Sequence, residues 1–168
     1  MLFQSPKMPI AASLASAFLI LGGCSWSHRH SDLECMERAM HFESNRSSRD
    51  GMIAVGSVVM HRVESTQFPN TVCGVVGQKG QFAPGIMSGR MDAKAMPKVT
   101  EAANAVLQGE RHPLTGNANF FHTAGHRFPY DNMHYVLVTG GNAFYEKRES
   151  QLVTQPVPPQ PLEGLTIQ

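Results

Sequence analysis

The chain has 168 residues and a net charge of +1, from 14 Lys and Arg against 13 Asp and Glu. A charge this close to zero, without a long run of basic residues, argues against nucleic acid as a partner. The length is enough for one domain with a hydrophobic core, and nothing in the sequence demands more than a monomer.

The N-terminus predicts export and lipid anchoring. Lys7 precedes an apolar stretch at 10–23, which is shorter than the about 20 residues of a membrane span and has the size of a signal-peptide core. It ends in LGGC at Cys24, which resembles a bacterial lipobox. We therefore expect a signal peptide at 1–23, a lipid on Cys24 and anchoring in the cell envelope. Ser25 is compatible with outer-membrane sorting towards the periplasm, and an ordinary signal peptide or membrane anchor is the alternative.

The other two cysteines, Cys35 and Cys73, form an even pair in a compartment expected to be oxidising. Such a pair predicts a disulfide, and two buried thiols that never meet are the alternative. Because no CxxC or HxxxH spacing accompanies them, we expect no zinc site on these cysteines.

Helices are predicted in the first two thirds of the chain. After a polar tether at 24–31, Asp32 is a plausible N-cap for a helix with apolar residues at helical spacing from Leu33 to about residue 42. Further helices are expected from Ser48 or Arg49 to about residue 63, from Asn70 or Thr71 to Val76, and over Ala93–Gln108 with Pro97 in the first turn.

The pattern then changes to loops and strands. Residues 78–90 are dense in Gly and Pro and predict an irregular loop. Strands are expected at 119–123, 134–139 and 143–145, where aromatic and β-branched residues gather. Helices followed by a small antiparallel sheet indicate an α+β domain over residues 32–149. The tail at 150–168 contains QPVPPQP and is expected to be disordered or polyproline II.

Glu43 is the strongest candidate for chemistry. It lies at the C-terminal end of an apolar helix, where the negative pole of the helix dipole and an apolar wall both discourage ionisation. A carboxylic acid that stays protonated near neutral pH can donate a proton to a leaving oxygen, as glycan-cleaving enzymes require. A surface carboxylate at a frayed helix end is the alternative.

Other candidates belong to the loop and the strands. The Gln81 amide suits sugar hydroxyls or an N-acetyl group and Phe82 could stack on a sugar, although Phe82 could equally fill the core while Gln81 faces water. His122 could line a cleft, or it could be a structural residue. Further possible cleft contacts are Tyr130, Asn132, Asn142 and Tyr145.

Two kinds of catalytic partner have weak support. A metal on His122, His126 and His134 is disfavoured because their spacing fits no common motif, so we expect no cofactor. A second catalytic carboxylate would have to come from Asp50, Glu64, Asp92 or Glu101. None of these acids has an obviously functional setting, so a single-acid mechanism carries weight.

Four ordered motifs resemble one family. ECMERAMHFESN, GMIAVGSVVMHRVES, FPNTVCGVVGQ and GQF follow one another from Glu34 to Phe82. Together they resemble the cell wall hydrolase family of spore-cortex-lytic enzymes, over about residues 33–145. The resemblance implies a lysozyme-like α+β fold, peptidoglycan as the substrate, Glu43 as the catalytic acid and a Gln-Phe pair at Gln81 and Phe82.

One departure and three alternatives accompany the resemblance. Many members continue after the Glu with Ala-Arg-Gly-Glu, whereas this chain has Ser-Asn-Arg-Ser at 44–47 and lacks the second acid. We expect a lytic transglycosylase in which Glu43 acts first as acid and then as base at the bond between N-acetylmuramic acid and N-acetylglucosamine. The alternatives are a hydrolytic muramidase, an N-acetylmuramoyl-L-alanine amidase and a non-catalytic lipoprotein that binds peptidoglycan.

Overall fold

The computed structural model describes residues 30–46 and 48–166. The expected signal peptide, the lipidation site at Cys24 and most of the tether lie outside the described residues. Among the helices of the described part, none is long and apolar enough to cross a membrane.

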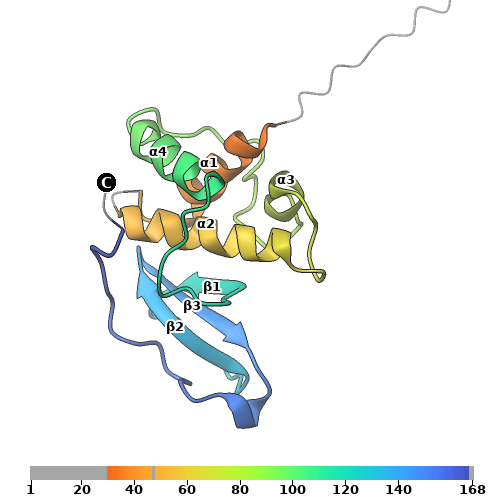
Figure 1. The fold of residues 1–168 in the computed structure, drawn as a ribbon, viewed down its shortest axis with the longest axis vertical. Helices are drawn as coiled ribbons and strands as arrows, with labels where there is room; N and C mark the ends of the chain where they lie inside the picture. Colours follow the sequence, from red (N-terminus) through yellow and green to blue (C-terminus); the bar gives the residue numbers. More distant parts are fainter. Residues whose placement is uncertain (1–29, 47, 167–168) are drawn as a thin grey trace, which may run out of the picture.

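A central helix separates the other helices from a small sheet (Figure 1). The α-helices of the described residues are α1 (Asp32–Glu43), α2 (Arg49–Glu64), α3 (Val72–Val76) and α4 (Met96–Leu107). The strands are β1 (Phe120–Thr123), β2 (Met133–Thr139) and β3 (Asn142–Lys147), followed by a short 3₁₀ helix at Ser150–Leu152. The predicted order of helices first and antiparallel sheet second is confirmed.

Helix α2 is central because it is apolar on nearly every side. All residues from Asp50 to Val59 are buried, and a helix that is hydrophobic all round must be covered by neighbours. Helices α1 and α4 cover one side and the sheet lies on the other. The Ser48 side chain caps the N-terminus of α2 by accepting from the Gly51 N–H.

The helix boundaries differ from the expectation at two N-termini. Ser31, and not Asp32, is the N-cap of α1, and its side chain accepts from the Glu34 N–H while Asp32 lies in the first turn. Helix α4 begins at Met96, three residues later than expected, because residues 93–95 form a turn instead. Pro97 lies in the first turn of α4, where a proline costs no intrahelical hydrogen bond.

The predicted disulfide between Cys35 and Cys73 is confirmed. It joins α1 to α3 across a sequence separation of 38 residues, with the two Cα atoms 5.2 Å apart. In the chain-entropy description, closing a loop of this length stabilises the fold by about 4 kcal/mol.

The sheet has the strand order β1-β3-β2, with both pairs antiparallel. Its β2–β3 turn touches the first turn of α2 so closely that a Cβ on Gly51 would lie 2.5 Å from the Gly140 Cα. The same Gly140 accepts a hydrogen bond from the Asn45 N–H at 3.0 Å. This turn therefore fastens the chain just after Glu43 to the sheet.

The C-terminal tail differs from the expectation of disorder. It follows the free edge of β2, where the Tyr135 N–H donates to the Gln155 carbonyl and the Leu162 N–H donates to the Val138 carbonyl, both at 2.9 Å. Figure 1 shows the tail continuing to the N-terminal end of α2. The prolines keep it extended, while the open edge of β2 supplies the partners that a disordered chain would lack.

The tail ends on a buried carboxylate. Asp50, which is 2% exposed, accepts from the Leu165 N–H at 2.8 Å and from the Thr166 N–H at 2.7 Å. Burial by itself would raise the pKa of Asp50, but the hydrogen bonds from Thr166 and Leu165 lower it below its ordinary value. Glu163 adds a second attachment, since it accepts from the Gly140 N–H at 2.7 Å.

We expect Asp50→Ala to destabilise the fold by about 1–3 kcal/mol, because the Leu165 and Thr166 N–H groups lose the buried carboxylate that accepts from them. Since folding lowers the pKa of Asp50, its contribution is present above the ordinary pKa of an aspartate and is lost as the pH falls through the folded value. Urea unfolding at pH 7 and pH 3 measures both effects. Asp131→Ala, at an exposed position, is the control, and equal stability of the two variants at pH 7 would contradict the role given to the tail.

Candidate active site

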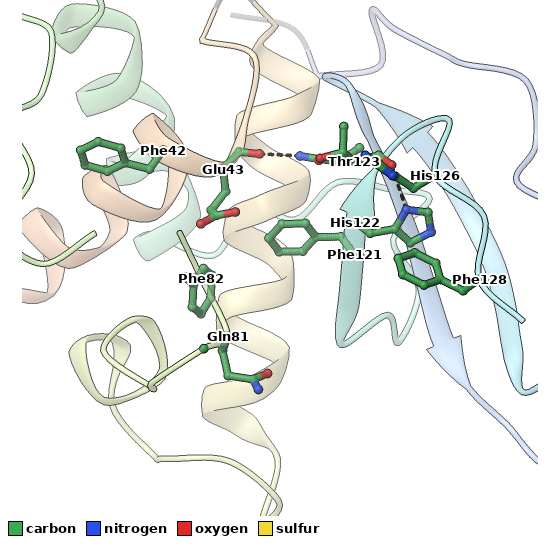
Figure 2. Close-up of a pocket in the computed structure, with 11 residues that line it drawn as sticks. Phe42, Glu43, Gln81, Phe82, Phe121, His122, Thr123, His126 and Phe128 are labelled. Carbon is green, nitrogen blue, oxygen red and sulfur yellow. Dashed lines mark hydrogen bonds between the residues drawn. The ribbon is translucent and has the colours of Figure 1, made fainter. Parts of the chain in front are cut away.

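A cavity of about 420 Å³ opens beside the C-terminal end of α1 (Figure 2). One wall comes from α1 and the loop after α3, and the opposite wall from β1, the segment that follows it and the start of β3. The lining residues are Phe42, Glu43, Gly80, Gln81, Phe82, Phe121, His122, Thr123, His126, Phe128 and Asn142.

Glu43 is the last residue of α1 and is held from both walls. Its side-chain Oε1 accepts from the Ala83 N–H at 2.5 Å, and its backbone carbonyl accepts from the Asn142 side-chain amide at 2.5 Å. In Figure 2 the Glu43 carboxylate lies near the rings of Phe82 and Phe121. One carboxylate oxygen is thus occupied by the loop, and the group faces the cavity.

The electrostatic environment of Glu43 favours the protonated form. Burial raises the pKa of Glu43 above its ordinary value, while the hydrogen bond from Ala83 and the positive charge of Arg62 oppose the rise. The net direction is upward. The sequence argument from an apolar wall at a helix end therefore agrees with the structure.

Arg62 is the cation that opposes this rise, and the sequence argument did not single it out. It is 3% exposed, and its guanidinium lies 5.1–5.7 Å from the ring centres of Phe68, Phe82 and Phe120. The Nε donates to the Asn119 carbonyl at 2.7 Å, but the buried Nη1 has no hydrogen-bond partner among the described residues. Burial lowers the pKa of Arg62 to about 10, against the pull of Tyr145 and Glu43, so the side chain stays charged at neutral pH.

Four of the predicted contact residues line the cavity. Gln81 is exposed there, and Phe82, which is 8% exposed, belongs to both the core and the cavity wall. The His122 Nε2 is hydrogen-bonded to the Tyr135 hydroxyl at 2.9 Å, and the same side chain lines the cavity. The structural and the cleft interpretations of this histidine therefore both hold. Asn142 reaches the site by binding the Glu43 carbonyl.

Three predicted contacts do not line the cavity. Tyr130 is 65% exposed and stacks on Phe128, which does line it, with ring centres 6.0 Å apart. Tyr145 lies against His122, and the Asn132 backbone carbonyl accepts from the Arg148 N–H. Tyr130 and Asn132 follow the strand in sequence, but the chain carries them past the cavity.

Phe128 was not predicted as a wall residue, and of the β1 side chains His122 was predicted at the cleft but Phe121 was not. Both of these side chains line the cavity, because β1 is an edge strand and one side of it is open. The signal that could have found Phe128 is the aromatic pair FPY at 128–130, next to Gly125 at φ 91°.

Glu43 is the one carboxylate on the wall of this cavity, as the described residues form it. The four other acids considered from the sequence have structural partners or lie elsewhere. Asp50 binds the tail, Glu64 pairs with Arg111, Glu101 pairs with Arg49, and Asp92 accepts from the Lys94 N–H. Residues 44–46 supply no second acid after Glu43. Instead, Ser44 donates to the Met40 carbonyl and Arg46 donates to the His41 carbonyl.

The three histidines considered as metal ligands lie at two different places in the fold. His122 and His126 line the cavity, whereas His134 accepts from the Thr154 N–H on the tail. In the described ranges, no three His, Cys, Asp or Glu side chains gather as a metal site would require.

Residues 46–145 match the cell wall hydrolase family. The chain belongs to that family. The match begins just after Glu43, and it covers the loop, the sheet and most of the cavity wall.

Curated relatives of this cell wall hydrolase include spore cortex-lytic enzymes. The enzyme of Bacillus cereus is 32% identical over 96 residues, which is 56% of this chain and 35% of the relative. That of Oceanobacillus iheyensis is 27% identical over 94 residues, which is 56% of this chain and 33% of the relative. The matched region thus spans about a third of the length of these relatives.

Two solved structures share the fold. The catalytic domain of the germination-specific lytic transglycosylase SleB from Bacillus anthracis aligns with a TM-score of 0.59 at 24% identity, over 71% of this chain and 98% of that one. The catalytic domain of the Bacillus cereus SleB protein aligns with a TM-score of 0.55 at 27% identity, over 71% and 94%. The chain therefore has the α+β fold of these catalytic domains.

We expect Glu43 to titrate above the ordinary range of a glutamate, since burial outweighs its two stabilising partners. Arg62→Gln should raise this pKa further, because a cation that favours the carboxylate is removed, while Arg62→Lys should restore it. Carbon-13 NMR titration of the Glu43 carboxyl measures all three proteins. A Glu43 pKa at or below the ordinary value in the wild type would contradict this account.

Proposed function

We propose that this protein is a lytic transglycosylase that cleaves the glycan strands of peptidoglycan, with Glu43 as the only acid and base. The observation that carries the proposal is a half-buried carboxylate with a raised pKa, the one carboxylate on the wall of an open cavity as the described residues form it. Family membership supports peptidoglycan as the substrate, and the SleB structure described as a lytic transglycosylase supports the reaction.

The reaction needs one group that gives a proton and then takes one back. Protonated Glu43 donates to the oxygen between N-acetylmuramic acid and N-acetylglucosamine, the bond from that oxygen to C1 breaks, and the electron pair leaves with the oxygen. Ionised Glu43 then removes the proton of the C6 hydroxyl of the muramic acid, and the C6 oxygen bonds to C1. The product is a 1,6-anhydro sugar, no water is consumed, and Glu43 is protonated again.

The surroundings of Glu43 suit both halves of this cycle. Burial raises the pKa of Glu43 and so favours the protonated carboxyl that the first step needs. After proton donation, the Ala83 N–H and the charge of Arg62 stabilise the carboxylate that remains. Phe82 and Phe121 place apolar rings beside the group, and a glycan held against them would displace water, which would favour capture of C1 by the internal hydroxyl over hydrolysis.

We expect the wild type to release 1,6-anhydro muropeptides from purified sacculi, and Glu43→Gln to lower the rate by about 10²–10⁴-fold while leaving the fold intact. Mass spectrometry of the products is the measurement. Glu37→Gln, a change of the same kind on the same helix but outside the cavity, is the matched control.

Other products would identify the competing functions. Reducing ends in place of anhydro ends would indicate a muramidase. Release of intact stem peptides, abolished by a chelator, would indicate an amidase. Binding to sacculi without loss of turbidity would leave a non-catalytic lipoprotein.

We also propose that the protein acts from the cell envelope, held by a lipid on Cys24 and facing the periplasm as a monomer. The LGGC sequence supports the anchor, and the Cys35–Cys73 disulfide fits an oxidising compartment.

We expect cells fed a labelled palmitate to incorporate it into the wild-type protein, and Cys24→Ser to abolish the incorporation and release the protein from the membrane fraction. Cys73→Ser serves as the control for the loss of a different cysteine. Labelling that persists in Cys24→Ser would contradict the anchor.

A further inference from the structure

A second hollow adjoins the candidate active site. It has a volume of about 200 Å³ and shares His126 and Phe128 with the active-site cavity. Its other walls are Arg127, Tyr135 of β2, and the tail segment Pro156–Pro158. A branched ligand in the cavity could therefore extend past Phe128 into this hollow.

Hydrogen bonds hold the tail wall of the hollow in place. The Tyr135 N–H donates to the Gln155 carbonyl at 2.9 Å, and the Gln155 side chain donates to the Val157 carbonyl at 2.6 Å. On the side of the active site, the Tyr135 hydroxyl is hydrogen-bonded to His122, which lines the cavity. The hollow is thus a formed feature that is linked to the active-site wall.

Arg127 gives the hollow its chemical character. It is exposed and makes no ion pair or hydrogen bond with any residue that the structure describes. Most other arginines of the described part are engaged: Arg38, Arg49, Arg111 and Arg148 each pair with a carboxylate, and Arg46 and Arg62 donate to backbone carbonyls. Arg90 is exposed like Arg127, but it lines neither hollow. A free guanidinium beside apolar walls is suited to a carboxylate carried on a partly apolar chain.

We propose that this hollow binds the stem peptide of peptidoglycan, with Arg127 pairing with one of its free carboxylates. The proposal rests on the proposed function, since it names a further part of the same substrate. The peptide branches from the muramic acid whose C1 reacts, so a glycan placed at Glu43 brings a carboxylate-bearing chain close to the cavity rim. Charge complementarity selects this occupant, and Phe128, Val157 and Pro158 offer apolar contacts to its side chains.

The test compares two substrates that differ only in charge. Purified sacculi are used as isolated, or after their free carboxylates have been coupled to methylamine. We expect the wild type to show a kcat/KM about tenfold higher on the untreated sacculi, the size expected of a charge-assisted hydrogen bond. Arg127→Gln should reduce this ratio to about one.

Two further variants sharpen the comparison. Arg90→Gln removes the same charge from an exposed arginine that lines neither hollow, and it should keep the wild-type ratio. Val157→Glu places a carboxylate on the tail wall, at a side chain that is 64% exposed, and it should lower the ratio as Arg127→Gln does.

The outcomes separate the two proposals. If the wild type releases no anhydro product from either substrate, the proposed function fails. If the wild type cleaves both substrates equally, or if Arg127→Gln keeps the wild-type ratio, the proposed function stands and the stem-peptide site is wrong. A ratio that falls equally in Arg90→Gln would also overturn the site, because the effect would then be one of overall charge.

Discussion

The contact between Gly51 and Gly140 is the constraint on which the site depends. With no Cβ at either position, the turn between β2 and β3 rests directly on the first turn of α2. That approach lets the Gly140 carbonyl accept from the Asn45 N–H and brings Asn142 to the backbone carbonyl of Glu43. The end of α1 is therefore fastened to the sheet, and the cavity between them has a fixed width. A side chain at Gly51 would clash with the Gly140 backbone, so the turn that fastens the chain after Glu43 would have to shift.

A balance of opposing effects makes Glu43 usable as both acid and base. A carboxyl group raised only by burial would donate a proton easily, but its carboxylate would be poorly tolerated afterwards. Arg62 and the Ala83 N–H lower that cost without removing the effect of burial. Arg62 can act in this way because the faces of three phenylalanine rings and one carbonyl accommodate its charge in a dry environment. The cation is therefore held inside the core and is not neutralised by a closer anion.

The sequence was informative where the pattern is local. Helical periodicity located α1 and α2 to within a few residues, the even cysteine pair predicted the disulfide, and the helix-end argument identified Glu43. It failed where the deciding partner is distant. Asp50 resembles an ordinary acidic residue in a first helical turn, and only the fold shows that residues 165 and 166 donate to it. The proline-rich tail likewise has no ordering signal of its own, since its order comes from the edge of β2. Tyr130 and Asn132 were predicted as possible cleft contacts, but neither side chain lines the cavity.

The family match covers the sheet up to residue 145 and does not include the tail. The family match ends at residue 145, and it includes Arg62, Phe82, His122 and Asn142, which surround the reacting group. The tail wall of the second hollow, Pro156–Pro158, lies beyond the match. Thr166, whose N–H donates to Asp50, also lies beyond it. In the proposed reaction, Glu43 and the first set lie at the bond that breaks, whereas the tail supplies no reacting group. An arginine-lined hollow closed by the tail is therefore the place where this chain can acquire a preference for the charge on its substrate while Glu43 keeps the same task.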